Sequence, residues 1–225
     1  MIPWQLLDSA PVPDGGAPLT LYRRGEEFSI RVGGYELMNS RLHGSEDALA
    51  ETTCDRLGAR PAPLLLIGGL GMGYTTAAAL RRLGSQARVV VAELVPAVIA
   101  WNHGVLGALA GHPLDDPRVS VREIDVASLL REEALAYDAI LLDVDNGPEG
   151  LTRPGNDWLY SHAGLTAARA ALASTGILAI WSASAAPAFS KQLRRAGFSV
   201  TELPCRARGR QGGSRHMIWL AQKNG

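Results

Sequence analysis

The chain has 225 residues, a length that suits one large domain with a sizeable buried core. Hydrophobic residues make up 47% and charged residues 20%, which excludes a disordered, collagen-like or coiled-coil chain. Lys and Arg together number 22 and are balanced by 22 Asp and Glu, so no overall field directs the chain to nucleic acid or to an anionic membrane.

The N-terminal part of the chain has the pattern of a small antiparallel sheet. Apolar and polar residues alternate over residues 19–38, and glycines interrupt the alternation at Gly25 and at Gly33-Gly34. Such alternation with glycine turns predicts strands joined by hairpins. We therefore expect a ribbon of strands in residues 1–44, followed by a helix over residues 45–57 with Ser45 as its N-cap.

Residues 45–225 have the pattern of an α/β domain. Short apolar runs alternate with amphipathic segments, which predicts a parallel sheet with helices on both faces. The last two apolar segments, FSVTELP and HMIWLAQ, are joined by a loop too short for a helix, so we expect an antiparallel pair at the sheet edge. The predicted strands cover residues 64–68, 88–93, 119–124, 138–143 and 176–181, and the predicted helices cover residues 74–83, 96–110, 126–135, 157–173 and 187–196.

A glycine-rich turn is the strongest local motif. Gly69, Gly71 and Gly73 follow the first buried run in the sequence IGGLGMG. Glu93 ends the next run, 20 residues after Gly73. Bare glycines let a ligand approach the backbone, and an acid at this distance can accept both ribose hydroxyls of a bound nucleoside. The alternative is that the glycines only pack the helix against the strand.

Two further acids follow predicted strands. Asp125 comes after the third strand and Asp143 ends the fourth. Because ligands of open parallel sheets bind outside the carboxyl ends of the strands, we expect these acids to line one crevice with the glycine turn. The even glycine spacing and the antiparallel last strand resemble the class I S-adenosylmethionine-dependent methyltransferase fold. That resemblance implies a Rossmann-like, mostly parallel seven-stranded sheet with an antiparallel last strand.

A closer resemblance covers most of the chain. The N-terminal ribbon, the segment LMNSRLHGSEDALAE, the IGGLGMG turn, and DAILLDVDNGPEGL followed by DWLYS are similar to the spermidine synthase (aminopropyltransferase) family. The resemblance implies a homo-oligomer, such as a dimer, in which the strand ribbon takes part. It also implies these site residues: Gly69, Gly71, Gly73, Glu93 and the adjacent Leu94 for the adenosyl donor, Asp125 with Val126 for its adenine, Asp143 for the donor and as the base, and Asp145 as a second catalytic carboxylate.

The departures from the family pattern bear on the reaction. Gly71 stands where the family carries an Asp that binds the donor's amine, and the family's Asp-Ser-Ser-Asp becomes Asp143-Val144-Asp145-Asn146. We therefore favour methyl transfer from S-adenosylmethionine to a small amine-type acceptor. The alternatives are aminopropyl transfer from decarboxylated S-adenosylmethionine, 3-amino-3-carboxypropyl transfer, and a catalytically inactive nucleoside-binding protein.

The candidate acceptor-binding residues lie outside the strand ends. His43 lies where the ribbon meets the sheet, Glu46 is on the following helix, and Trp158 and Tyr160 follow the fourth strand. For each of them, packing or solvation is the alternative interpretation. The arginine-rich loop RARGRQGGSR has no interleaved aromatic residue, so we interpret it as a solvated hairpin tip and expect no nucleic-acid partner.

The remaining patterns concern the cellular setting. Cys54 and Cys205 lie far apart, with neither a CxxC pair nor a nearby His cluster. This spacing predicts neither a disulfide framework nor a metal site. The sequence has neither the pattern of a secretion signal at its start nor an apolar run of membrane-spanning length, so we expect a cytoplasmic protein without a membrane partner.

Overall fold

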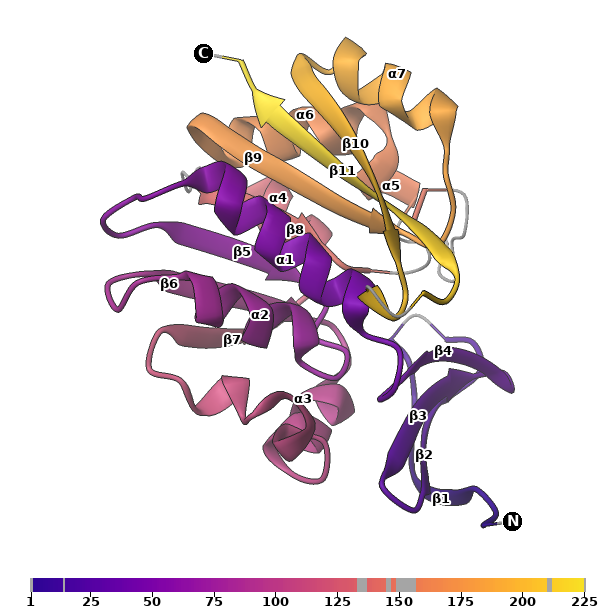
Figure 1. Cartoon of the computed structure of the whole chain (residues 1–225). Coiled ribbons are helices and arrows are strands. Elements are labelled where there is room, and N and C mark those ends of the chain that lie inside the picture. The colour runs from indigo at the N-terminus through magenta and orange to yellow at the C-terminus, as the bar shows by residue number, and fades with distance from the viewer. Residues whose placement is uncertain are drawn as a thin grey trace.

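The computed structural model describes residues 2–13, 15–132, 137–144, 147–148, 157–209 and 212–224. Within these residues the chain forms a four-stranded antiparallel sheet followed by a seven-stranded mixed sheet with helices on both faces (Figure 1). No helix in the described part of the chain is both long and apolar enough to cross a lipid bilayer. The separation of the chain into units of residues 1–44 and 45–225 stays a prediction.

The first sheet contains the predicted hairpins and one strand that was not predicted. Its strands are β1 (Gln5–Ala10), β2 (Leu19–Arg24), β3 (Glu27–Val32) and β4 (Tyr35–Asn39), paired in that order. β2, β3 and β4 turn at the glycines that the sequence indicated. In β1 every side chain except that of Ala10 is exposed, and the register shifts between Leu6 and Asp8. β1 therefore has no buried face that an apolar alternation could have revealed.

The second sheet has the strand order β10-β11-β9-β8-β5-β6-β7. β5, β6, β7, β8 and β9 are parallel neighbours, whereas β11 runs antiparallel to both β9 and β10. The predicted mostly parallel, Rossmann-like sheet with an antiparallel last strand is thus confirmed. The strands are β5 (Leu64–Gly68), β6 (Arg88–Glu93), β7 (Val119–Glu123), β8 (Tyr137–Leu142), β9 (Leu172–Ser182), β10 (Phe198–Arg206) and β11 (Arg215–Lys223).

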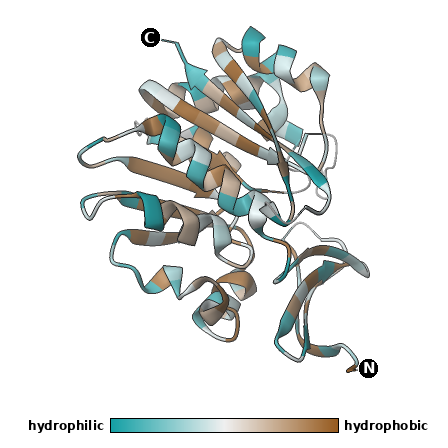
Figure 2. Ribbon diagram, in the orientation of Figure 1, coloured by the Kyte–Doolittle hydropathy of each residue, from teal (hydrophilic) through white to brown (hydrophobic). Residues whose placement is uncertain are grey.

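Helices cover the two faces of this sheet, and alternate strand residues supply each core. Leu65 and Ile67 of β5 pack with α1, α2 and α3, whereas Leu66 packs with the helices of the opposite face. Figure 2 shows the central strands as largely hydrophobic, as expected for strands buried on both faces. The helices are α1 (Gly44–Leu57), α2 (Tyr74–Arg82), α3 (Pro96–His103), α4 (Val126–Glu132), α5 (Asp157–Tyr160), α6 (His162–Ala171) and α7 (Pro187–Arg195).

Several helix ends differ from the predictions for local reasons. The predicted helix over 96–110 ends at His103 and continues as 3-10 turns at Gly107–Ala110 and Pro113–Asp115. The predicted helix over 157–173 is two helices, because the Ser161 hydroxyl accepts a hydrogen bond from Gly164 N–H and begins α6 anew. Ser45 was expected to cap α1, but His43 is the N-cap residue and the Ser45 hydroxyl donates to Glu46 at 2.6 Å.

Candidate functional site

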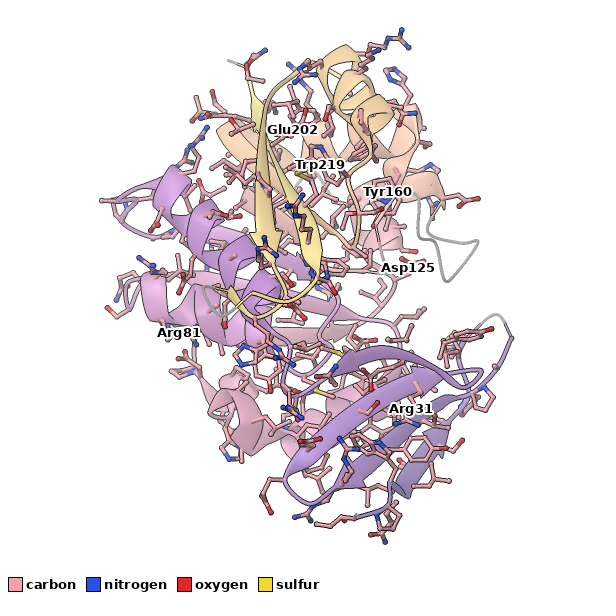
Figure 3. All side chains as sticks on the ribbon, turned by 45° about the vertical axis from the view of Figure 1, so that its right-hand side comes forward. Arg31, Arg81, Asp125, Tyr160, Glu202 and Trp219 are labelled. Carbon is pink, nitrogen blue, oxygen red and sulfur yellow. The ribbon has the colours of Figure 1, made fainter. Side chains whose placement is uncertain are left out.

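A cavity of about 550 Å³ lies between the two sheets. One wall consists of the carboxyl ends of β5, β6, β7 and β8, where Gly69, Glu93, Asp125 and Asp143 border the space. The opposite wall comes from β2, β3 and β4 and from the loop between β1 and β2. Figure 3 shows Asp125 at the edge of the main sheet that faces the N-terminal sheet. The apolar residues of this second wall are Val12, Pro13, Ala17, Leu19, Ile30, Val32, Leu37 and Met38.

The glycine turn after β5 needs glycine because of both its conformation and its neighbours. Gly69, Gly71 and Gly73 all have positive φ, at 89°, 53° and 81°. A Cβ on Gly69 would collide with the carbonyl oxygen of Asp143, so only a bare backbone lets β5 turn beside the end of β8. The buried Asn102 amide donates to the carbonyl of Gly71 at 2.8 Å and holds the turn from α3. The turn therefore presents a fixed backbone, without side chains of its own at the glycines, to the cavity.

Glu93 joins the end of β6 to the glycine turn. Its side chain is nearly buried, at 8% exposure, and it accepts hydrogen bonds from Leu70 N–H at 2.9 Å and from Val95 N–H at 2.8 Å. Burial raises the pKa of this carboxyl, and the backbone donors oppose that rise. The backbone N–H groups of Leu94 and Gly71 also act on this carboxylate, so the hydroxyls of a ligand in the cavity would share its oxygens with these donors.

Asp125 and its neighbours form the cavity wall at the end of β7. Asp125 Oδ1 accepts from Ala127 N–H at 2.8 Å, and its carbonyl accepts from Ser128 N–H at 2.9 Å, so the residue begins α4. Val126, which follows it, and Leu94, which follows Glu93, both border the cavity with apolar side chains. A planar aromatic ring placed here would meet apolar surface on its faces and a carboxylate at its edge.

Asp143, the predicted base, has a pKa that is raised into the range useful for proton transfer. Its remaining exposed surface borders the cavity, and the Thr75 hydroxyl donates to its Oδ2 at 2.6 Å. Desolvation raises the pKa of Asp143 to about 6, although the Thr75 hydrogen bond opposes the rise. A carboxylate with this pKa can hold or release a proton close to neutral pH.

Glu46 forms a pair of acids with Asp143. It lies in the first turn of α1 with 8% of its surface exposed. Desolvation raises the pKa of Glu46 to about 7, and the negative charge of Asp143 adds to the rise. The charge interaction shows that Glu46 lies near the predicted base, but Glu46 is not among the residues that border the cavity, so its predicted contact with the acceptor stays a prediction.

His43 and Gly73, two other predicted site residues, are not among those that border the cavity. The ring of His43 stacks on that of Tyr74, with ring centroids 4.1 Å apart, and His43 Nδ1 is 2.7 Å from Asp47 Oδ2. This hydrogen bond raises the pKa of His43. Gly73 begins α2 and packs against Asn102 and Pro113. Asp145 lies outside the described residues, so its role stays a prediction.

Neither Trp158 nor Tyr160 is among the residues that border the cavity. The Arg131 guanidinium lies 4.0 Å from the centre of the Trp158 ring. Tyr160 is buried, and its hydroxyl donates to the carbonyl of Val144 at 3.1 Å. Tyr160 therefore supports the backbone that follows Asp143. The predicted contact of these two residues with the acceptor stays a prediction.

Sequence reasoning missed the contribution of the N-terminal sheet to the cavity. Met38 of β4 lies directly over the glycine turn, with its sulfur 2.8 Å from the position that a Cβ on Gly71 would take. The alternation of β2 to β4 predicted one buried face, but it held no signal that this face covers the ends of β5 to β8. Among the described residues, no group of three or more His, Cys, Asp and Glu side chains is placed to hold a metal ion.

Comparison with known proteins identifies the fold. No protein-family model and no curated protein matches the sequence. Spermidine synthase from Thermotoga maritima superposes with a TM-score of 0.74 at 16% identity, over 98% of this chain and 73% of that one. A spermidine synthase in complex with the transition-state analogue AdoDATO gives 0.73 at the same identity.

Two further solved structures extend this likeness. A probable spermidine synthase from Corynebacterium glutamicum gives a TM-score of 0.62 at 14% identity, over 97% of this chain and 79% of that one. The 1,6-didemethyltoxoflavin-N1-methyltransferase of Burkholderia thailandensis, with bound 1,6-didemethyltoxoflavin and S-adenosylhomocysteine, gives 0.56 at 19% identity, over 81% and 80% of the two chains. The chain therefore shares the fold of spermidine synthases and of a class I methyltransferase, as the sequence indicated.

Proposed function

We propose that this chain transfers an alkyl group from an S-adenosyl sulfonium donor to a small amine acceptor. The leading reaction is methyl transfer from S-adenosylmethionine. The observation that carries the proposal is the cavity in which the glycine turn, Glu93, Asp125 and Asp143 meet at four neighbouring strand ends. Its volume of about 550 Å³ lies within the range of pockets for ligands of this size, roughly 300–1,000 Å³.

The residues that border the cavity supply groups that support binding of this donor. Glu93, fixed by backbone N–H groups, is the acid that would accept the ribose hydroxyls in this proposal. Asp125, between apolar neighbours, is placed to accept from the adenine amino group. The described charged side chains that border the cavity are all acidic, which stabilises a cationic sulfonium in a site of low dielectric constant. The bound donor supplies the electrophilic carbon and a good leaving group.

The protein's part in the reaction is to position the amine and to remove its proton. The amine nitrogen bonds to the carbon on sulfur, the carbon–sulfur bond breaks, and its electron pair stays on sulfur as a neutral thioether. As the new bond forms, the nitrogen loses a proton to Asp143, so the product amine is neutral. General-base catalysis of this kind contributes roughly 10²- to 10⁴-fold to the rate. Glu46, next to Asp143, supplies a second carboxyl that attracts a cationic acceptor.

Two observations bear on the donor. Met38 occupies the space in front of Gly71, where the spermidine synthase family carries an Asp that binds the donor's amine, and this supports methyl transfer. Conversely, no described side chain that borders the cavity is basic, so none pairs with the carboxylate of S-adenosylmethionine. That observation favours a second candidate, aminopropyl transfer from decarboxylated S-adenosylmethionine.

Product analysis with two donors tests the proposal. The purified chain is incubated with S-adenosylmethionine or its decarboxylated form and a panel of primary amines and diamines, and the products are identified by mass spectrometry. We expect one donor to give an alkylated amine, and Asp143→Asn to lower turnover at least about 100-fold with donor binding retained. The control is Asp115→Asn, at an exposed acid outside the cavity.

Two results would count against catalysis by Asp143. Equal turnover in Asp143→Asn and the unmodified chain would remove this residue as the base. Donor binding without product from any amine would instead favour a nucleoside-binding protein.

A further inference from the structure

A row of hydrogen-bonded polar groups leads away from the acid pair. The Ser45 hydroxyl is fully buried and lies 2.6 Å from Glu46 Oε2. On its other side, His216 Nδ1 lies 2.9 Å from the same hydroxyl. His216 is half-buried on β11, which places its ring between the buried serine and the surface. Glu46, Ser45 and His216 thus form a hydrogen-bonded series, and its first member, Glu46, lies close enough to Asp143 to feel its charge.

The surroundings keep each member of this series in a form that can carry a proton. Around Glu46 lie Asp143 at the end of β8, His43 before α1 and Cys205 on β10. Burial raises the pKa of the Cys205 thiol to about 11, so it stays neutral near pH 7. Desolvation lowers the pKa of His216, which keeps its imidazole neutral and able to accept a proton.

Packing holds the imidazole of His216 in place beside the serine. Its ring lies edge-on to that of Trp181, with centroids 5.0 Å apart and an interplanar angle of 81°. Met217, the next residue of β11, pairs with Ser182 of β9, so the backbone of His216 is fixed next to the main sheet. A fixed imidazole and a buried hydroxyl meet the geometric requirement for repeated proton transfer along hydrogen bonds.

We propose that Ser45 and His216, with Glu46, form the path by which the proton taken up at Asp143 leaves the buried site. The inference rests on the proposed function, because that function generates the proton. It assigns a role to two residues that do not border the cavity, and it makes them positioning and relay residues rather than groups that contact the substrate.

The transfer balances with O–H and N–H bonds alone. The proton passes from Asp143 to the Glu46 carboxylate, and protonated Glu46 then donates to Ser45 Oγ. Ser45 in turn donates its own proton to neutral His216 at Nδ1, and the imidazolium releases the Nε2 proton to solvent. Each group returns to its starting protonation state once the hydroxyl and the imidazole tautomer reset. The alternative is that these hydrogen bonds only fasten α1 to β11.

The first test measures proton linkage directly and needs no acceptor. The titration of His216 is followed by NMR of the labelled imidazole in four proteins: unmodified, Glu46→Gln, Ser45→Ala and the double variant. We expect Glu46→Gln to shift the His216 midpoint in the unmodified background and to leave it nearly unchanged in the Ser45→Ala background. Equal shifts in both backgrounds would show a through-space charge effect without a path, and would overturn the inference, as would no shift in either.

The second test distinguishes proton transfer through His216 from a purely structural role of these hydrogen bonds between α1 and β11. His216→Asn retains a hydrogen-bonding group near Ser45 but cannot take up a proton. With the amine that gives most product, we expect His216→Asn to lower kcat at least about tenfold without changing the KM for the donor. Imidazole in the buffer should restore part of the activity of His216→Ala. The matched control is His103→Asn, at an exposed histidine at the end of α3.

The two tests distinguish failure of the path from failure of the proposed function. If no amine is alkylated although the NMR titrations are linked through Ser45, the proposed reaction is wrong and the proton connection stands. If product forms and kcat of His216→Asn stays within twofold of the unmodified chain, the path is wrong and the reaction stands.

Discussion

Replacing Glu46 with glutamine should stabilise the folded chain at alkaline pH and leave its stability almost unchanged in acid. In the folded chain the pKa of Glu46 is raised from 4.5 to about 7 by burial and by the charge of Asp143. Below pH 4.5 the carboxyl is protonated in both the folded and the unfolded chain. As the pH rises from 4.5 to 7, the unfolded chain releases this proton first, so stability is lost through that window.

The size of the effect follows from the same values. One pKa unit corresponds to 1.36 kcal/mol, so the rise to about 7 costs the unmodified chain about 3 kcal/mol of unfolding free energy above pH 7. Glutamine keeps the shape of the side chain without its charge. The free energy of unfolding of Glu46→Gln, relative to the unmodified chain, should therefore rise by up to this amount between pH 4.5 and 7.5, or by about 6–12 °C in Tm.

Urea denaturation at a series of pH values measures this difference. The control is Glu51→Gln on the same helix, whose half-exposed side chain makes a surface ion pair with Arg82 at 3.5 Å. Surface pairs of this kind contribute little, so the control should differ from the unmodified chain by a small amount at every pH. A difference between Glu46→Gln and the unmodified chain that is the same at pH 5 and pH 8 would refute the buried acid pair.

Three further variants test the donor side of the cavity. Gly69→Ala should lower the free energy of unfolding, measured by urea denaturation, by at least about 2 kcal/mol because Gly69 has a positive φ and lies against the end of β8. The control Gly84→Ala, at a glycine with open space around it, should change the free energy of unfolding by no more than about 0.5 kcal/mol. Gly71→Asp should be destabilising alone and be rescued by Met38→Ala, with a coupling of about 1–3 kcal/mol in the four-variant cycle; strict additivity would contradict the contact. Glu93→Gln should weaken donor binding at least about tenfold in calorimetry, and unchanged affinity would remove its ribose role.

The elements that the sequence predicted correctly are those whose pattern is local. The buried strands β5, β6 and β8 are continuous apolar runs, and the hairpins of β2 to β4 combine alternation with glycine turns. The glycine turn and Glu93 were predicted as parts of one site because they are separated by one helix and one strand, which gives a regular spacing along the sequence. β1 escaped prediction because its side chains are almost all exposed, so nothing in its pattern distinguishes it from a loop.

The sequence predicted only the part of the site that lies at the carboxyl edge of the main sheet. The rule that strand ends meet brought Gly69, Glu93, Asp125 and Asp143 together, and the structure places all four around one cavity. That rule carries no information about segments outside the sheet edge.

The covering wall and the proton path depend on tertiary packing. Met38 reaches Gly71 only because the N-terminal sheet docks on this edge, and His216 meets Ser45 across 171 residues of sequence. Alternation in a strand shows that it has a buried face, but it does not show what that face covers.

The central claim is that the cavity binds an S-adenosyl sulfonium donor, and calorimetric titration tests it most directly. The purified chain is titrated in parallel with S-adenosylmethionine, its decarboxylated form and methylthioadenosine, and the same titrations are repeated with Glu93→Gln. We expect at least one sulfonium donor to bind more tightly than neutral methylthioadenosine, with weaker binding in the variant, and the preferred donor identifies the transferred group. Absence of binding by all three compounds would contradict the account.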